Sequence, residues 1–361
     1  MINMAEKAKS VKTSIWDQIT NVKEMSRDEY LKLVRRIGLF VIIGFAVSFA
    51  VFLGLALLGG VGQVIGIIAS ANPYWLGLAF IFQFLGYVLM YGKWRYLLHE
   101  LKLKVPTKKS FLIYLSLYSM NITPGNIGRI VAAFSLTRIT NIRFINVVPI
   151  VTMDIFTDFM GAGILALLTA IFVQKFVIYV IAIDVLLTLP FLLILNKSFF
   201  NLVKRLIKSG KSLRIFTLYG DEYYASQSIL NKPKTYGVAL AFTLPAAFLS
   251  AMSLFLAMHA IGLTPHLISS ISISTTAQIF GMVTAVPGNI GVTDGTLVAL
   301  LGSTFGLDTT VSSALTIMTR IVTLWFGIIM GAIALFYTMK YWAMRPSDSE
   351  KDGKRKRKKK D

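Results

Sequence analysis

The chain has 361 residues, of which 55% are hydrophobic and 15% are charged, and it contains no cysteine. Its mean hydropathy of +0.68 is typical of a polytopic helical membrane protein, and the lack of cysteine excludes disulfides and thiol catalysis. The net charge of +20 does not indicate nucleic-acid binding, because Lys and Arg gather in loops and tails beside apolar segments, where anionic lipid headgroups lie.

The first half of the chain is predicted to contain an amphipathic segment, three membrane spans and one short hairpin. Residues 1–36 place apolar and charged side chains at helical spacing, which indicates a cytosolic or interfacial helix. The loop from Gly59 to Asn72 carries no charge. Residues 108–140 hold two apolar stretches, each too short to cross the ~30 Å hydrocarbon core, and are predicted to form a re-entrant hairpin. Full spans are expected over residues 37–58, 74–98 and 144–172.

The second half, residues 173–340, is predicted to repeat this order. A basic cytosolic loop, residues 196–235, follows its first span, and a second re-entrant hairpin, residues 265–303, precedes its last span. Residues 341–361 are polybasic and are expected to form a disordered tail beside anionic headgroups. Full spans are expected over residues 176–195, 236–261 and 310–338.

The distribution of basic residues predicts the topology. If both short segments are re-entrant, every Lys and Arg except Lys175 and Arg320 falls on one side, which the positive-inside rule makes cytoplasmic, together with both termini. The expected fold is all-α: a multi-pass protein of the cell membrane with six full transmembrane helices and two re-entrant hairpins. Residues 37–172 and 173–340 then form an inverted repeat, an arrangement typical of alternating-access carriers when it contains broken helices.

Each hairpin is broken by the same five residues, Pro-Gly-Asn-Ile-Gly, at 124–128 and 287–291. Pro lacks an amide donor and two glycines destabilise a helix, and broken backbone inside a bilayer persists only where it is buried or lines a polar cavity. Unpaired amides at the following helix start favour an anion such as phosphate. A plain turn capped by Asn explains a single copy equally well, but two symmetric copies favour a substrate site. Its candidate residues are Pro124, Gly125, Asn126, Gly128, Arg129, Pro287, Gly288, Asn289 and Gly291.

Charged residues within the predicted spans form a second group of candidates. Arg320 lies near mid-depth, where an unpaired Arg costs ~3 kcal/mol or more, so it needs a carboxylate or a substrate phosphate. Asp154 and Asp158 share a helix face, and two close carboxylates favour holding a proton, which suits a charge switch; Asp184 is a further candidate. A structural ion pair between Arg320 and one of these acids is an equally good explanation. Asp294 either compensates the helix dipole or binds substrate directly.

Several motifs resemble one known family: Gly92–Leu98, Thr123–Gly128, the pair Asp154 and Asp158, Val286–Gly291 with Asp294, and Arg320 with Val322–Phe326. They are similar to the lysylphosphatidylglycerol synthase transmembrane-region family of flippase-like membrane proteins, over about residues 37–340. Arg129 and Ala132 stand where this family usually has Glu and Arg, which implies a different substrate choice. Members that make aminoacylated lipids carry a large soluble domain after the membrane region. Only a short basic tail follows Arg345 here, so aminoacyl transfer is not expected.

These features predict a translocase that moves an anionic or phosphate-bearing lipid, such as a phospholipid or a polyprenyl-phosphate-linked sugar, between leaflets. No nucleotide motif is present, so a gradient or substrate mass action is expected to drive it. No metal is expected, since His259 and His266 lack acidic or Cys companions. No enzyme activity or cofactor is expected either, and no nucleophile–base spacing is visible. A membrane-embedded transferase for lipid-linked substrates and an accessory subunit of a separate synthase remain alternatives. The partners expected are membrane lipids and no nucleic acid, with a synthase and a second copy of the chain as further candidates.

Overall fold

The fold is described from a computed structural model of the chain, which describes residues 27–123, 128–140, 142–173, 178, 180–182, 185–186, 214–284 and 286–338. Within these ranges the secondary structure is helical throughout, without a strand. Five helices are long and apolar enough to span a membrane. The predicted class, an all-α polytopic membrane protein, is confirmed. The expected span 176–195 lies mostly outside the described residues, and so do Asp184 and the tail 341–361.

The first half contains six described helices and one short 3-10 turn. They are α3 (Arg27–Gly59), α4 (Val61–Ser70), α5 (Pro73–Glu100), α6 (Thr107–Ser119), the 3-10 turn η2 (Met120–Ile122), α7 (Ile130–Thr140) and α8 (Phe144–Val173).

In the second half, the first helix whose bounds are described lies on the basic segment, and the last span is divided by a π-helical turn. Its elements are α11 (Arg214–Leu230), α12 (Pro233–Ala260), α13 (Leu267–Val283), the 3-10 turn η5 (Pro287–Asn289), α14 (Val292–Phe305), α15 (Thr309–Arg320), the π-helical turn η6 (Ile321–Trp325) and α16 (Phe326–Thr338).

The uncharged segment between the first two spans, which the sequence predicts as a loop, is mostly the ten-residue helix α4. Its glycines disfavour a helix, but Val64 is 1% exposed and packs with Leu55 of α3 and Ala314 of α15. Tertiary burial therefore outweighs the low helix propensity. The connection to α5 is fixed locally, because the Asn72 side chain accepts a hydrogen bond from the Tyr74 amide at 2.9 Å.

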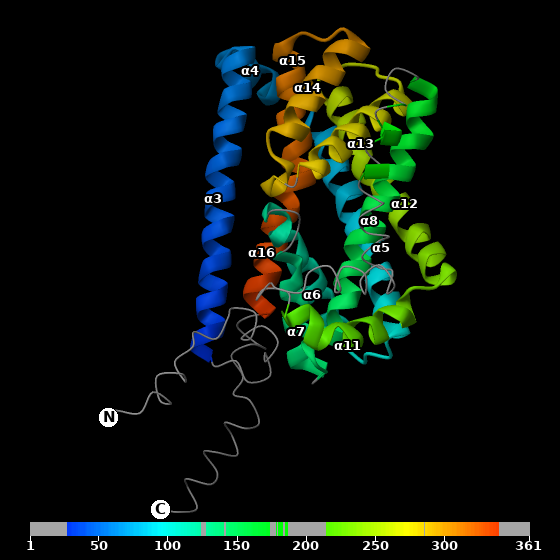
Figure 1. Cartoon of the computed structure of the whole chain (residues 1–361). Helices are drawn as coiled ribbons and strands as arrows, with labels where there is room; N and C mark the ends of the chain where they lie inside the picture. The colour runs from blue at the N-terminus through cyan, green and yellow to red at the C-terminus, as the bar shows by residue number, and fades with distance from the viewer. Residues whose placement is uncertain are drawn as a thin grey trace, which may run out of the picture.

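The two hairpins approach the middle of the molecule from opposite ends (Figure 1). The first consists of α6, η2 and α7, and the second of α13, η5 and α14. Their tips meet, since η2 packs against η5. The 3-10 turns η2 and η5 are therefore brought together, although they lie about 160 residues apart in the chain.

Equivalent helices of the two halves make equivalent contacts with the other half. Helix α5 packs against α12, α6 packs against α16, and α8 packs against α13. Small residues allow further close contacts between the two halves: a Cβ added to Gly161 of α8 would lie 2.3 Å from Thr243 Cγ2 of α12. A Cβ added to Gly327 of α16 would lie 2.6 Å from the Tyr87 hydroxyl of α5. This reciprocal pairing is what two inverted copies related by a two-fold axis would produce.

Candidate functional site: a polar cavity between the hairpin tips

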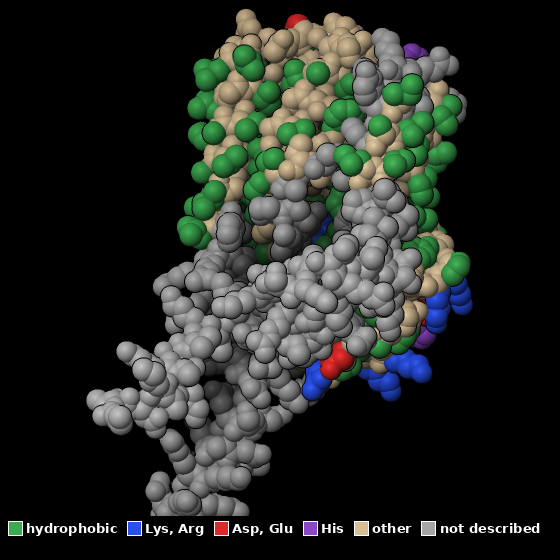
Figure 2. Space-filling view, in the orientation of Figure 1, with side chains coloured by type: hydrophobic (Ala, Val, Ile, Leu, Met, Phe, Trp, Pro, Cys, Tyr) green, Lys and Arg blue, Asp and Glu red, His purple; other side chains and the backbone are tan. Residues whose placement is uncertain are grey.

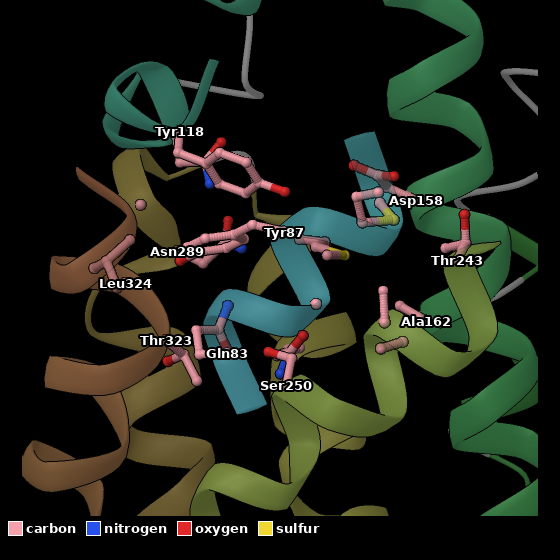
Figure 3. Close-up of a pocket in the computed structure, with 18 of the residues that line it drawn as sticks. Gln83, Tyr87, Tyr118, Asp158, Ala162, Thr243, Ser250, Asn289, Thr323 and Leu324 are labelled. Carbon is pink, nitrogen blue, oxygen red and sulfur yellow. The ribbon is translucent and has the colours of Figure 1, made fainter. Parts of the chain in front are cut away.

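A cavity of about 190 Å³ lies where the two hairpin tips meet α5, α8 and α12. It is many times larger than the ~10–15 Å³ that one water molecule needs. Polar side chains from both halves surround it, including Tyr87, Tyr118, Asp158 and Asn289 (Figure 3). The molecule is visibly hollowed near mid-height, and a basic side chain lies deep in that hollow (Figure 2). The remaining polar lining residues are Gln83, Asn121, Arg129, Thr243, Ser250, Gln278, Arg320 and Thr323.

The second Pro-Gly-Asn-Ile-Gly loop has the backbone that its residue types favour. Gly288 and Gly291 have φ of 63° and 86°, and Asn289, one of the few residue types that tolerate this region, has φ of 54°. The Asn289 amide donates to the Val286 carbonyl at 2.9 Å, and the Ile290 amide donates to the Pro287 carbonyl at 3.3 Å. These two amides already have acceptors, and the loop presents Gly288 and Asn289 to the cavity.

Asp294 joins this loop to the last span. Its Oδ2 accepts a hydrogen bond from the Gly291 amide at 2.7 Å, and its Oδ1 lies 3.0 Å from Nε of Arg320. Arg320 also donates from Nη2 to the Gly288 carbonyl at 2.6 Å. Asp294 is 0% exposed and Arg320 is 6% exposed, so the pair is formed in a low-dielectric interior. Asp294 therefore caps the helix, which is one of the two roles that the sequence left open, and it also holds the Arg320 cation. Direct binding of substrate by Asp294 stays a prediction.

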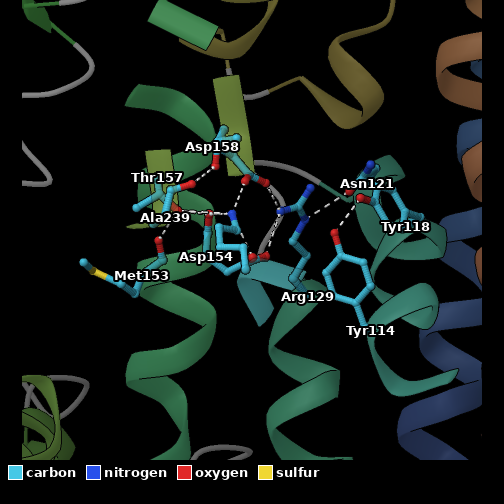
Figure 4. Close-up of polar contacts among 11 residues, drawn as sticks. Tyr114, Tyr118, Asn121, Arg129, Met153, Asp154, Thr157, Asp158 and Ala239 are labelled. Carbon is cyan, nitrogen blue, oxygen red and sulfur yellow. Dashed lines mark hydrogen bonds and ion pairs between the residues drawn. The ribbon is translucent and has the colours of Figure 1, made fainter. Parts of the chain in front are cut away.

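A second charge cluster lies where α5, α7 and α8 meet (Figure 4). Lys93 is fully buried, and its Nζ contacts both Asp154 (2.9 Å) and Asp158 and donates to Thr157 Oγ1 at 3.1 Å. Arg129 places Nη1 2.7 Å from Asp158 and 3.4 Å from Asp154. Two cations thus balance two carboxylates. The side chain of Asp158 is 19% exposed and that of Asp154 only 2%, so Asp158 is the acid that reaches the cavity.

Arg129 also ties its own hairpin together, because its Nε donates to Asn121 Oδ1 at 3.1 Å. Nearby, Gly128 donates its amide to Thr123 Oγ1 at 2.9 Å, which closes the loop onto the 3-10 turn. Pro124, Gly125 and Asn126 lie outside the described residues. The first hairpin therefore contributes a cation to an acidic span, whereas the second contributes an anion to a span that carries the cation.

The structure pairs these charges differently from the expectation. The sequence suggested that Arg320 pairs with Asp154 or Asp158, but its carboxylate partner is Asp294, which the second hairpin brings beside it. The predicted topology places Lys93 among the cytoplasmic flanking charges, but Lys93 is buried at the centre of the cluster that it forms with Asp154 and Asp158. The available signal was its place seven residues before the end of a 28-residue helix, well inside the span. Among the described residues no group of His, Cys, Asp or Glu is arranged to hold a metal ion.

Taken together, the membrane-length helices and the polar cavity define a polytopic α-helical membrane protein with an internal site built from two broken hairpins. The chain belongs to the lysylphosphatidylglycerol synthase TM region family, a model of which matches residues 41–331. The resemblance found in the sequence motifs is therefore confirmed, and it places the protein among membrane proteins related to lipid handling.

Two curated relatives cover most of the chain. A UPF0104 membrane protein of Methanocaldococcus jannaschii is 23% identical over 312 residues, which cover 80% of this chain and 92% of the relative. A UPF0104 membrane protein of Methanothermobacter thermautotrophicus is 21% identical over 351 residues, which cover 88% of this chain and 98% of the relative. Both alignments extend over nearly the full length of the relatives, so the similarity concerns the whole membrane architecture.

Proposed function

We propose that the protein is a translocase that moves a phosphate-bearing lipid, such as a phospholipid or a polyprenyl-phosphate-linked sugar, between the leaflets of the cell membrane. The observation that carries this proposal is the polar cavity between two opposed hairpin tips, which both Arg129 and Arg320 line. A phosphate group that enters this cavity meets two guanidinium groups, the side chains that bind phosphate most strongly in proteins.

Both arginines can turn to a phosphate while the carboxylate that each leaves keeps another polar contact. When Arg129 leaves Asp158, the carboxylate keeps its contact with Lys93. When Arg320 leaves Asp294, that carboxylate keeps the Gly291 amide. The cost of an unpaired buried charge, ~3–5 kcal/mol, is therefore reduced at both positions. The headgroup phosphate replaces one ion pair by another, which allows binding without trapping the lipid.

The same two ion pairs fasten each hairpin to the span that follows it. Arg129 holds the first hairpin to Asp158 of α8, and Asp294 of the second hairpin holds Arg320 of α15. Release of one connection at a time would open the cavity toward one leaflet while the other side stays closed. Protonation within the Asp154–Asp158 pair is the proposed charge switch that would couple this movement to a proton gradient.

Reconstitution of the purified protein tests this proposal. Liposomes contain trace fluorescent phospholipids of different headgroups or a labelled polyprenyl phosphate, and a membrane-impermeant quencher reports the outer leaflet with and without a pH gradient. We expect faster loss of protected fluorescence for phosphate-bearing lipids, and no acceleration for a labelled neutral lipid without phosphate. Equal rates with and without protein for every phosphate-bearing lipid would overturn the proposal.

A further inference from the structure

A single layer of apolar side chains separates the cavity from one flank of the bundle. Leu324 lines the cavity, and it packs with Ile122 of the first hairpin tip, Ile290 of the second loop and Ile328 of α16. Partly buried Trp325 packs against the outside of this cluster. These side chains, which we call the apolar wall, are the layer that a chain attached to a headgroup in the cavity would cross on this flank.

Helix α3 covers the apolar wall from outside and faces lipid with its other side. A Cβ added to Gly44 would lie 2.2 Å from Ile122 Cγ1, so the helix backbone rests directly on the wall. The ring of Phe45 lies 4.1 Å from that of Trp325. Other side chains of α3 are widely exposed, Phe49 by 70% and Ile42 by 66%, as expected for a helix in contact with acyl chains. Figure 1 shows α3 standing along the side of the bundle.

The wall is joined to the charge pair in the cavity through one short turn. Arg320 ends α15, the π-helical turn η6 follows at once, and Trp325 ends that turn against α3. π-helical turns of this kind occur often at functional sites and at points of adjustable geometry. Arg320 and the contact between Trp325 and Phe45 therefore lie at the two ends of one five-residue turn.

We propose that the seam between α3 and the η6–α16 segment is the lateral passage for the acyl or polyprenyl chains of the transported lipid. This inference rests on the proposed function. The headgroup occupies the cavity while the apolar chains remain in the bilayer and pass between Phe45 and Trp325. The cavity has room for a headgroup, and chains that stay in the hydrocarbon region avoid exposure to its polar lining. When the headgroup phosphate replaces Asp294 as the partner of Arg320, the π-helical turn moves and the seam opens.

A reversible cross-link tests the passage, because the chain has no native cysteine. The variant Gly44→Cys/Ile122→Cys places two cysteines at positions whose Cβ atoms lie 3.4 Å apart, close to the ~3.8 Å of disulfides. In liposomes we expect the reduced variant to transport the phospholipid and the oxidised variant to be no faster than protein-free liposomes. Reductant should restore transport. The control is the single variant Ile122→Cys, treated with the same oxidant, whose transport rate should be the same before and after oxidation. Gly44→Cys alone is unsuitable, because its Cβ would lie 2.2 Å from Ile122 Cγ1.

A second measurement distinguishes a passage from mere stiffening of the protein. A phospholipid with a photoreactive group at the middle of its acyl chain should label peptides that contain Phe45 or Trp325 in the reduced variant, and much less in the oxidised one. The passage is overturned if the oxidised variant transports as fast as the reduced one, or if the label maps to other helices. Absence of transport by both the wild type and the reduced variant would instead overturn the translocase function, and this inference with it.

Discussion

Neutralising Asp294 tests whether the second hairpin is fastened by an ion pair. In Asp294→Asn the amide oxygen retains the hydrogen bond from the Gly291 amide, while Arg320 loses its carboxylate and keeps only the Gly288 carbonyl. Removing one partner of a buried pair typically costs ~3–5 kcal/mol. We expect the variant to lose about 3 kcal/mol of unfolding free energy, which is the lower end of this range. The loss is small because the retained carbonyl contact and the adjoining cavity partly solvate the guanidinium group.

The charge origin of this loss is tested by a double variant. Asp294→Asn combined with Arg320→Gln leaves no unbalanced charge, so it should be more stable than either single variant. Unfolding is followed by tryptophan fluorescence during SDS titration of mixed micelles. The matched control is Asp308→Asn, an exposed helix cap whose Oδ1 accepts from the Val311 amide at 2.8 Å; Asn caps equally well. If Asp294→Asn costs no more than this control, the pair does not fasten the hairpin.

Three further predictions concern the Lys93 charge cluster, helix packing and the cavity. Lys93→Met leaves two carboxylates with one cation and should cost ~3–5 kcal/mol in the same SDS titration; an effect below ~0.5 kcal/mol would contradict its central place. Gly331→Ala places a Cβ 2.2 Å from the Ser119 amide nitrogen and should lower the thermal midpoint, whereas Gly54→Ala meets nothing within 4 Å and should not; equal midpoints would refute the close helix contact. A cysteine at Ser250 should react with a water-soluble thiol reagent and be protected by the transported lipid, and unchanged labelling would place the lipid elsewhere.

The sequence was sufficient to predict the hairpin breaks near the site, because their chemistry is local. A Pro followed by Gly, Asn and Gly disrupts a helix in any context, and Gly288, Asn289 and Gly291 adopt the positive φ that these residue types tolerate. Burial of Asp294 and Arg320 was likewise predictable from charges placed within apolar segments. The sequence therefore identified residues that line or adjoin the cavity before their spatial arrangement was known.

The charge partners were not predictable, because they depend on which helices pack together. Asp154 and Asp158 were close in sequence and invited a pairing with Arg320, but α8 brings them to Lys93 of α5 instead. Lys93 looked like a flanking charge because Arg95 and further basic residues follow it, yet α5 continues to Glu100 and carries Lys93 into the interior. Helix α4 was missed for a related reason, since its stability comes from burial of Val64 against distant helices.

The most direct test of the account is transport by a variant that loses the cavity arginine but stays charge-balanced. Arg129→Gln/Asp158→Asn removes one cation and one acid and leaves the Lys93–Asp154 pair, so the fold should be retained. Arg143→Gln is the control, since its pair with Glu222 is exposed. In liposomes we predict that the double variant moves phosphate-bearing lipids no faster than protein-free liposomes, while Arg143→Gln matches the wild type. Wild-type transport by the folded double variant would contradict the role of the cavity arginine in binding the headgroup.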